Sequence, residues 1–462
     1  MTAPTPRRVL VLGGTGAFGE RLVRGLAREE FAVIVGARGL PRVEALAREV
    51  GAAAAQLDAE ALTAEQFRAL DAWAVVDASG PFVAGRWGVA RAAIGAGAHY
   101  LDLADGRAFV AAFPAALDAE ARAAGLVAVT GVSSTPALSC AALDALTAGW
   151  TGVDTVEVAI LPGNRAPRGL AVIRSILSWA GKPVRVFLDG RWQERPGWGL
   201  TRRLRAEGLG PRLASLADTP DLDAVPARYG VRRSAVFRAG LEVPLMHLGL
   251  LVASLPLRVL PGLSLEPLAR PVRAAASWLD GLGSDRGGMV AAATGRDAAG
   301  DPVAATWTLV AEAGDGPWVP SLPALAALRR LAQETVEPGA RSAAGFLTLP
   351  EIEATFAPHR ITSGIRVDRP APVVPLFRRV LGEAAWAALP APVRDVHAPR
   401  PGSRWKARRG WRAPQPSPPA SSRASSASRP PRTAFPSAWR SRPTPPARPG
   451  AVTSAARASA AG

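Results

Sequence analysis

Residues 7–19, RRVLVLGGTGAFG, decide the fold of the N-terminal part of this chain. The apolar run before the glycines predicts a short buried strand, and residues 17–28 carry apolar side chains at helical spacing. Glycines between a strand and a helix permit a tight turn, and the helix N-terminus offers free N–H groups to a pyrophosphate. We therefore expect a dinucleotide to bind at Gly14, Thr15, Gly16, Ala17, Phe18 and Gly19.

The next hundred residues repeat the same alternation of strand and helix. Residues 32–36, 74–78 and 126–130 are short apolar runs that predict strands, and residues 41–50 and 88–96 predict helices between them. Apolar strands that alternate with helices are typical of a parallel sheet covered on both faces. The sequence thus predicts an α/β fold, a Rossmann-type doubly wound parallel sheet.

The pattern changes beyond residue 150. Residues 154–161, 184–193 and 289–312 predict strands, the last two interrupted by turn residues as in hairpins. We expect an antiparallel sheet in an α+β second domain. The predicted domains are 1–140 for NADP binding, 141–370 for substrate and association, 371–398 as the start of a third domain, and 399–462 as a disordered basic tail.

The end of the second predicted strand indicates which dinucleotide binds. NAD sites usually place an acidic residue there, whereas this strand ends at Gly36-Ala37-Arg38. Arg38 is able to pair with a 2′-phosphate, so we expect NADP(H) in preference to NAD(H). The alternative is that Arg38 is an ordinary surface arginine. Ser79, Gly80 and Pro81 follow a later strand and are expected to pass beside the same cofactor.

Several classes of protein are excluded. A single cysteine and four scattered histidines provide no metal-ligand spacing, so no metal site is expected, and a cytoplasmic location fits this cysteine usage. Neither Tyr100 nor Tyr229 is followed four residues later by lysine, which argues against the Tyr–Lys mechanism of short-chain dehydrogenases. The chain also lacks the G-x-S-x-G motif of serine hydrolases.

Four motifs in order resemble one family. These are VLGGTGAFG at 11–19, ASGPF at 78–82, GAGAHYLDLAD at 95–105 and TGVSSTPALS at 130–139. Together they resemble bacterial saccharopine dehydrogenase-like oxidoreductases. The resemblance implies that the glycine turn holds NAD(P), that the Gly-Pro-Phe loop lies near the nicotinamide, and that a second domain carries the substrate pocket. Residues 375–397 resemble the start of an uncharacterised domain that follows this oxidoreductase in bacteria.

The Tyr-x-Asp run of this family supplies the candidates for proton transfer. Asp102 and Tyr100, with His99 beside them, are expected near the nicotinamide, where a carboxylate or phenol could move the proton that accompanies a hydride. The alternative is that Asp102 braces the loop and Tyr100 fills the domain interface. The chain departs from its relatives by lacking a cysteine in the preceding helix and by having Ala104-Asp105-Gly106 after the run. Saccharopine carries several α-carboxylates, and no arginines of this sequence can be assigned to bind them, so saccharopine itself is not the expected substrate.

The excess positive charge is concentrated at one end of the chain. Of a net charge of +17, residues 396–462 supply 13 basic side chains and no acidic one. The remaining body is close to neutral, so we expect no specific nucleic-acid partner for it. The Arg/Pro/Ser/Ala composition after residue 399 predicts disorder and is also what a shifted reading frame in GC-rich DNA would give. A basic tail that binds an anionic polymer is the competing hypothesis.

The expected activity is NAD(P)H-dependent oxidoreduction of a carbonyl, imine or enoyl compound. The alternative is a non-catalytic sensor or scaffold that binds NADP(H) without turnover. Residues 243–263 are strongly apolar but contain three prolines, His247 and Arg258, which favours packed helices over a membrane span. This stretch suggests a lipid-like substrate. Peripheral membrane contact through it, and a homodimer, remain open.

Overall fold

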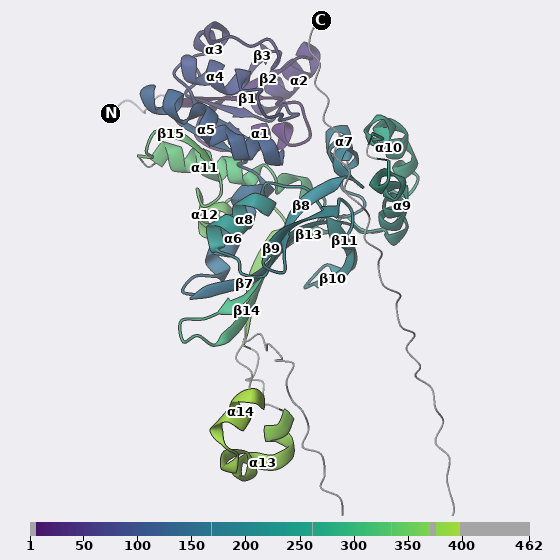
Figure 1. Cartoon of the computed structure of the whole chain (residues 1–462). Helices are drawn as coiled ribbons and strands as arrows, with labels where there is room; N and C mark the ends of the chain where they lie inside the picture. Colours follow the sequence, from purple (N-terminus) through teal and green to yellow (C-terminus); the bar gives the residue numbers. More distant parts are fainter. Residues whose placement is uncertain (1–5, 168, 261, 334, 370–375, 398–462) are drawn as a thin grey trace, which may run out of the picture. The chain divides into compact units, whose positions relative to one another are not determined.

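The structure is a computed structural model that describes residues 6–167, 169–260, 262–333, 335–369 and 376–397 (Figure 1). The chain divides into two compact units, residues 1–374 and 375–462. In the second unit, α13 (Leu376–Ala388) and α14 (Ala391–His397) form where the sequence suggests the start of a third domain. The tail at 399–462, with its two hypotheses, lies outside the described residues. The features below all belong to the first unit.

The N-terminal sheet contains seven parallel strands in the order β15-β6-β5-β4-β1-β2-β3. The strands are β1 (Arg7–Leu12), β2 (Phe31–Ala37), β3 (Ala53–Gln56), β4 (Ala74–Asp77), β5 (His99–Asp102), β6 (Val127–Thr130) and β15 (Gly339–Ser342). The helices between them are α1 (Gly19–Leu26), α2 (Leu40–Val50), α3 (Ala64–Leu70), α4 (Gly88–Gly95) and α5 (Arg107–Ala123). The strand order reverses direction between β1 and β4, the position where sheets of this kind bind ligands. The predicted Rossmann-type fold is confirmed.

Strand β1 shows why the sheet is buried on both faces. Val9 and Val11 point into a core shared with the second domain, whereas Leu10 and Leu12 point into a second core. All four side chains are almost fully buried. Burying each apolar side chain contributes about 1.5–3 kcal/mol, so an uninterrupted apolar strand is stable only in this central position.

The seventh strand of this sheet comes from far along the chain. β15 pairs in parallel with β6, Gly339 opposite Val127 and Ser342 opposite Thr130. The predicted boundaries place residues 339–342 in the second domain, so the structure adds a strand from that range to the first sheet. The segment is only four residues long and reads GARS, which provides no apolar alternation for sequence analysis to detect.

The second sheet has nine strands and is mixed. Its main order is β10-β11-β12-β7-β13-β14-β16, and β8 pairs with β12 and β9. The strands are β7 (Gly152–Leu161), β8 (Pro183–Leu188), β9 (Arg191–Pro196), β10 (Arg202–Ala206), β11 (Gly210–Leu216), β12 (Ser234–Leu241), β13 (Gly287–Arg296), β14 (Pro302–Ala311) and β16 (Ile361–Asp368). The expected hairpins β8–β9 and β13–β14 are present.

The expectation of a purely antiparallel second sheet is wrong at one pair. β12 runs parallel to β7, with Ser234 opposite Thr155. Parallel neighbours need a long crossover, which residues 162–233 provide. That crossover includes α7 (Leu170–Trp179) and α8 (Asp221–Tyr229). The remaining helices of this unit are α6 (Ser139–Leu146), α9 (Pro244–Ser254), α10 (Ala269–Ser277), α11 (Leu322–Gln333) and α12 (Leu349–Glu353).

An ion-pair cluster ties the two domains together. Arg107, at the start of α5, donates to Asp223 of α8 at 2.6 Å and to Asp218 at 3.1 Å. It also donates to the carbonyl oxygen of Arg185 in β8 at 2.7 Å. The Arg107 side chain is only 12% exposed, so these contacts are weakly screened and hold α5 against the second sheet.

Candidate dinucleotide site

The glycine turn after β1 has the close packing that its sequence predicts. Gly13 has a φ of +74°, and a Cβ there would lie 2.7 Å from the Cα of Ser79. A Cβ on Gly19, the first residue of α1, would collide with the carbonyl oxygen of Gly13. The turn closes through a hydrogen bond from the Gly16 N–H to the Gly13 carbonyl at 2.9 Å. Only glycines permit this approach of backbone to backbone.

The turn leaves backbone donors at the start of α1. Among the described hydrogen bonds, the N–H groups of Thr15, Ala17 and Phe18 have no acceptor. These groups precede an eight-residue helix whose dipole is positive at this end. The arrangement can therefore bind the oxygens of a pyrophosphate, as the sequence predicts for residues 14–19.

The loop after β4 lies against this turn. Asp77, the last residue of β4, accepts hydrogen bonds on Oδ1 from the Ser79 N–H at 2.8 Å and the Ser79 hydroxyl at 2.5 Å. Phe82 packs on Phe109 with ring centroids 5.4 Å apart, which anchors the other end of the loop. The structure thus brings the predicted residues 79–81 next to the turn, at the β1–β4 switch point.

Two arginines follow β2 on the side of the turn where a ribose 2′-phosphate is expected. Arg38 is exposed at the strand end, and its carbonyl oxygen accepts from Gln56 Nε2 at 3.0 Å. Arg42, in the first turn of α2, donates Nη2 to the carbonyl oxygen of Thr15 at 3.0 Å. Sequence analysis missed Arg42, although its position four residues after Arg38 at a helix start was a usable signal. Arg42 also borders a pocket of about 200 Å³ between α1 and α2.

The candidate catalytic residues Asp102 and Tyr100 lie inside the domain. Asp102 is fully buried, and its Oδ1 accepts from the N–H of Ala104 at 3.0 Å, the N–H of Gly131 at 2.7 Å and the Thr130 hydroxyl at 2.9 Å. Burial raises the pKa of Asp102 to about 7, although these hydrogen bonds act in the opposite direction. The side chain holds the loops after β5 and β6 together, which is the bracing alternative.

Tyr100 occupies the core of the first domain. Its ring stacks on Phe113 of α5 with centroids 5.8 Å apart, and its hydroxyl donates to Asp77 Oδ2 at 3.4 Å. Burial, with the nearby carboxyls, raises the pKa of this phenol well above its usual value. His99, at the start of β5, accepts from the Val127 N–H at 3.1 Å through Nδ1. All three side chains have contacts that stabilise the sheet.

Asp105 is an exposed acid at the edge of the sheet that carries the glycine turn. It lies on the loop between β5 and α5, three residues after Asp102. The next residue, Gly106, is so close to the Gly80–Phe82 loop that a Cβ would lie 2.7 Å from the carbonyl oxygen of Phe82. Partial desolvation by its surroundings raises the pKa of Asp105. Sequence analysis named Ala104-Asp105-Gly106 as a departure from the family but gave Asp105 no role.

Segments from beyond residue 150 complete the surroundings of the turn. A Cβ on Gly169, which precedes α7, would lie 3.9 Å from the Cβ of Ala17. The Ser321 hydroxyl donates to the carbonyl oxygen of Phe18 at 2.9 Å, and the Ser133 hydroxyl donates to that of Pro320 at 2.9 Å. The turn is thus in contact with the second domain as well as with its own sheet. No group of His, Cys, Asp and Glu side chains among the described residues could hold a metal ion.

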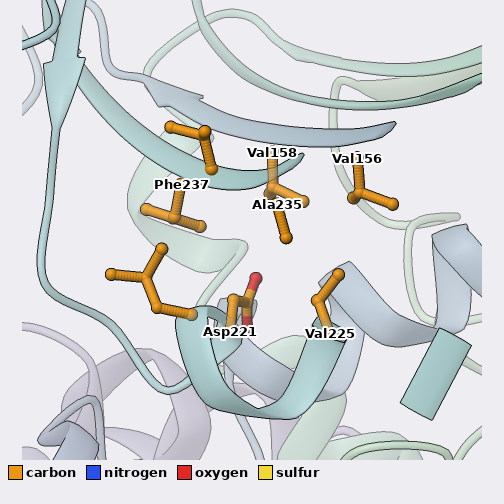
Figure 2. Close-up of a pocket in the computed structure, with 8 residues that line it drawn as sticks. Val156, Val158, Asp221, Val225, Ala235 and Phe237 are labelled. Atoms are coloured by element: carbon orange, nitrogen blue, oxygen red, sulfur yellow. The ribbon is translucent and has the colours of Figure 1, made fainter. Parts of the chain in front are cut away.

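The second domain contains a small pocket around a buried acid. Asp221, in the first turn of α8, points toward apolar side chains of β7 and β12, among them Val158 and Ala235 (Figure 2). It is 2% exposed, and within the described part of the chain neither oxygen accepts a hydrogen bond of normal geometry. Burial raises its pKa to about 7, and only Ser139 acts in the other direction.

Comparisons with known proteins agree with this geometry. Residues 9–129 match the family model described as the saccharopine dehydrogenase NADP binding domain. Among solved structures, saccharopine dehydrogenase (L-Glu forming) from Saccharomyces cerevisiae is 15% identical with a TM-score of 0.58, covering 78% of this chain and 100% of its own. At that identity the likeness shows a shared fold. No curated protein sequence matches the chain.

Other solved structures match a smaller part. Serine dehydrogenase from Escherichia coli is 18% identical with a TM-score of 0.23, covering 27% of this chain and 80% of its own. An actinorhodin polyketide ketoreductase with NADPH is 16% identical with a TM-score of 0.23, covering 28% and 70%. These low scores support no inference.

The fold and the turn define a two-domain dinucleotide-binding protein. The family model then specifies its type, because the matched residues contain the turn, the loop after β4 and β5. This chain carries a saccharopine dehydrogenase-like NADP-binding domain, which confirms the resemblance seen in the sequence for residues 9–129.

Proposed function

We propose that the protein is an NADP(H)-dependent oxidoreductase that transfers a hydride between the nicotinamide and a carbonyl, imine or enoyl group. The observation that carries the proposal is the packing of the Gly13–Gly19 turn against Ala78 and Ser79 at the β1–β4 switch point. When bound there, the cofactor supplies the hydride. The chain's own residues position it and move the accompanying proton.

The preference for NADP(H) rests on two guanidinium groups. Arg38 is exposed and free to turn toward a 2′-phosphate, and the hydrogen bond from Arg42 to Thr15 fixes a second positive charge beside the turn. β2 ends without the carboxylate that would accept hydrogen bonds from a free ribose 2′-hydroxyl. A cofactor with a ribose 2′-phosphate is therefore favoured over one with a free 2′-hydroxyl.

We assign the proton transfer to Asp105 in place of Asp102. Asp105 is exposed on the loop that touches Gly80–Phe82, whereas Asp102 is sealed in the core by three hydrogen bonds. Desolvation raises the pKa of Asp105 and so favours its protonated form more than in an ordinary aspartate, as a proton donor requires. Asp102 then acts as a positioning residue that holds the adjoining loops.

Calorimetry with NADPH and NADH on the full chain tests the cofactor proposal. We expect NADPH to bind at least about tenfold more tightly than NADH, because one modest charge-assisted contact contributes about that much affinity. Equal affinity would overturn the preference, and no binding of either would overturn the function.

A turnover assay tests the chemistry. NADPH absorbance is followed with aldehydes, ketones, imines and enoyl thioesters of short and long chain. We expect Asp105→Asn to lower kcat at least about tenfold without changing NADPH affinity, within the range for removing a general acid. Exposed Asp58→Asn is the matched control. Tight NADPH binding without turnover of any compound would support a sensor and contradict the enzyme.

A further inference from the structure

Helices α9 and α10 lie at the edge of the second sheet, beside α7 and β11 in Figure 1. Short 3₁₀ turns at Pro256–Arg258 and Glu266–Leu268 join them. Leu250, Leu265 and Ala269 of this segment pack on Ile173 and Leu177 of α7. We call residues 244–278 the helical hairpin.

The first helix of the hairpin buries two polar side chains and exposes several apolar ones. The two fully buried side chains of α9 are polar, His247 and Ser254, and the partly buried Leu250 packs on α7 beside them. His247 Nε2 shares a hydrogen bond with the Ser215 hydroxyl at 2.8 Å, and its carbonyl oxygen accepts from Trp198 Nε1 at 3.2 Å. The side chains that point away from the protein are apolar: Leu245, Leu248, Val252 and Leu255. A helix adapted to water would show the opposite arrangement.

Further exposed apolar side chains follow α9 along the sequence. Of 21 exposed large apolar side chains among the described residues, 11 lie between residues 245 and 282. The most exposed are Trp278 at 87% and Val259 at 76%. Apolar surface concentrated in this way marks a site of interaction with another apolar phase or partner.

The charges around this surface identify its partner. Arg258, Arg270 and Arg273 are exposed, and none has a recorded ion pair within the described residues. Within residues 244–278 these three arginines stand against a single acidic residue, the exposed Glu266. A symmetric contact between two copies would bring these like charges together, whereas the phosphates of anionic lipids would neutralise them.

The length of the helices limits how the hairpin could bind lipid. No helix among the described residues is both long and apolar enough to cross a bilayer. Leucine and valine on one face, an exposed tryptophan and flanking arginines are the features of helices that lie in the interface plane.

We propose that the helical hairpin is a docking surface for an anionic membrane. Leu245, Leu248, Val252 and Trp278 enter the boundary between headgroups and acyl chains, and Arg258, Arg270 and Arg273 contact lipid phosphates. This surface is separate from the dinucleotide turn, so its test is independent of the proposed activity.

Sedimentation with vesicles tests the surface on the full chain. Vesicles of phosphatidylcholine with phosphatidylglycerol are compared with phosphatidylcholine alone. The variant Leu248→Gln/Val252→Gln is compared with Ile365→Gln/Val367→Gln, a matched pair of half-exposed apolar residues on β16. We expect the first variant to bind anionic vesicles about tenfold more weakly and the control to bind as the wild type does.

The salt dependence of vesicle binding distinguishes the contribution of the hairpin from that of the basic residues at 399–462, which every variant retains. At about 0.5 M salt, binding through charge alone is largely lost, whereas insertion of apolar side chains persists. Equal binding of wild type and Leu248→Gln/Val252→Gln under both conditions would overturn the proposal.

Fluorescence locates the contact. Brominated lipids should quench an emission component that disappears in Trp278→Phe. Absence of quenching would contradict insertion. If sedimentation velocity instead showed a dimer that Leu248→Gln/Val252→Gln dissociates, a second copy would be the partner and the membrane proposal would be wrong.

Discussion

Arg42 donates a hydrogen bond from Nη2 to the carbonyl oxygen of Thr15, 3.0 Å away, and so joins the start of α2 to the middle of the glycine turn. The contact brings a guanidinium to the turn before any cofactor is bound. A preformed positive charge reduces the entropy lost when a phosphate is captured.

The first prediction concerns cofactor choice. Arg38→Ser should weaken NADPH binding by about 10- to 100-fold, because a charge-assisted contact contributes about 1.5–3 kcal/mol, and should leave NADH binding within a factor of about two. Titration calorimetry with both cofactors measures this. Arg48→Ser, an exposed arginine later in α2, is the matched control. An equal loss for NADPH and NADH would show that Arg38 does not contact the 2′-phosphate.

The second prediction concerns the close approach at the turn. Gly13→Ala places a Cβ 2.7 Å from the Cα of Ser79 in a left-handed backbone, so the turn and the loop after β4 must separate. We expect NADPH binding to be lost. Gly51→Ala is the control, because Gly51 also has a positive φ of +71° but has open space around it.

Unfolding in urea distinguishes these two glycines. Gly51→Ala should lower the free energy of unfolding by about 1 kcal/mol, the ordinary cost of alanine in the left-handed region. Gly13→Ala should lower the free energy of unfolding by at least about 2 kcal/mol more than Gly51→Ala does, since the clash with Ser79 adds to the backbone strain. Similar values for both would refute the packing argument.

The sequence predicts this turn well because its signal is local. Glycines at fixed spacing between an apolar run and a helix can be recognised without knowing the rest of the fold. The Tyr-x-Asp run that forms β5 is recognised through the family resemblance, but the resemblance does not say which of its side chains reaches the cofactor. Tyr100 and Asp102 are therefore the catalytic residues that the sequence predicts, although they lie in the core. Arg107 meets Asp218 and Asp223 more than a hundred residues away, and no local pattern predicts such a contact.

The third prediction concerns Asp102. Asp102→Asn should retain the fold and bind NADPH within about threefold of wild type, because the amide oxygen can still accept from Ala104, Thr130 and Gly131. Asp102→Ala leaves these buried donors unpaired and should lower the free energy of unfolding by about 3 kcal/mol. Thermal unfolding and calorimetry on the pair measure the difference. Loss of activity in Asp102→Asn, with binding and stability intact, would restore Asp102 as the proton donor.

The fourth prediction concerns Asp221 and pH. Its folded-state pKa is about 7 against an ordinary value of 3.8, so the folded chain holds this proton more tightly than the unfolded chain does. The contribution of Asp221 to stability is therefore greatest in acid, falls as the pH rises from about 4 to about 7, and is constant above.

Asp221→Asn removes this dependence. At pH 8 the variant should be more stable than wild type by on the order of 3 kcal/mol, and near pH 4 the two should differ little. Asp58→Asn, at an exposed site, is the control. A variant less stable than wild type at pH 8 would show that the buried carboxylate has a favourable partner.

The pairing of β15 with β6 has a consequence for synthesis and for engineering. The nucleotide-binding sheet is not a contiguous module, because its last strand leaves the ribosome some two hundred residues after the one it pairs with. A fragment that stops near residue 140 would end in an unpaired edge of Val127–Thr130, a template for aggregation. Grafting this domain onto another protein therefore requires inserting the foreign domain between β6 and β15, in the position that the second sheet occupies here.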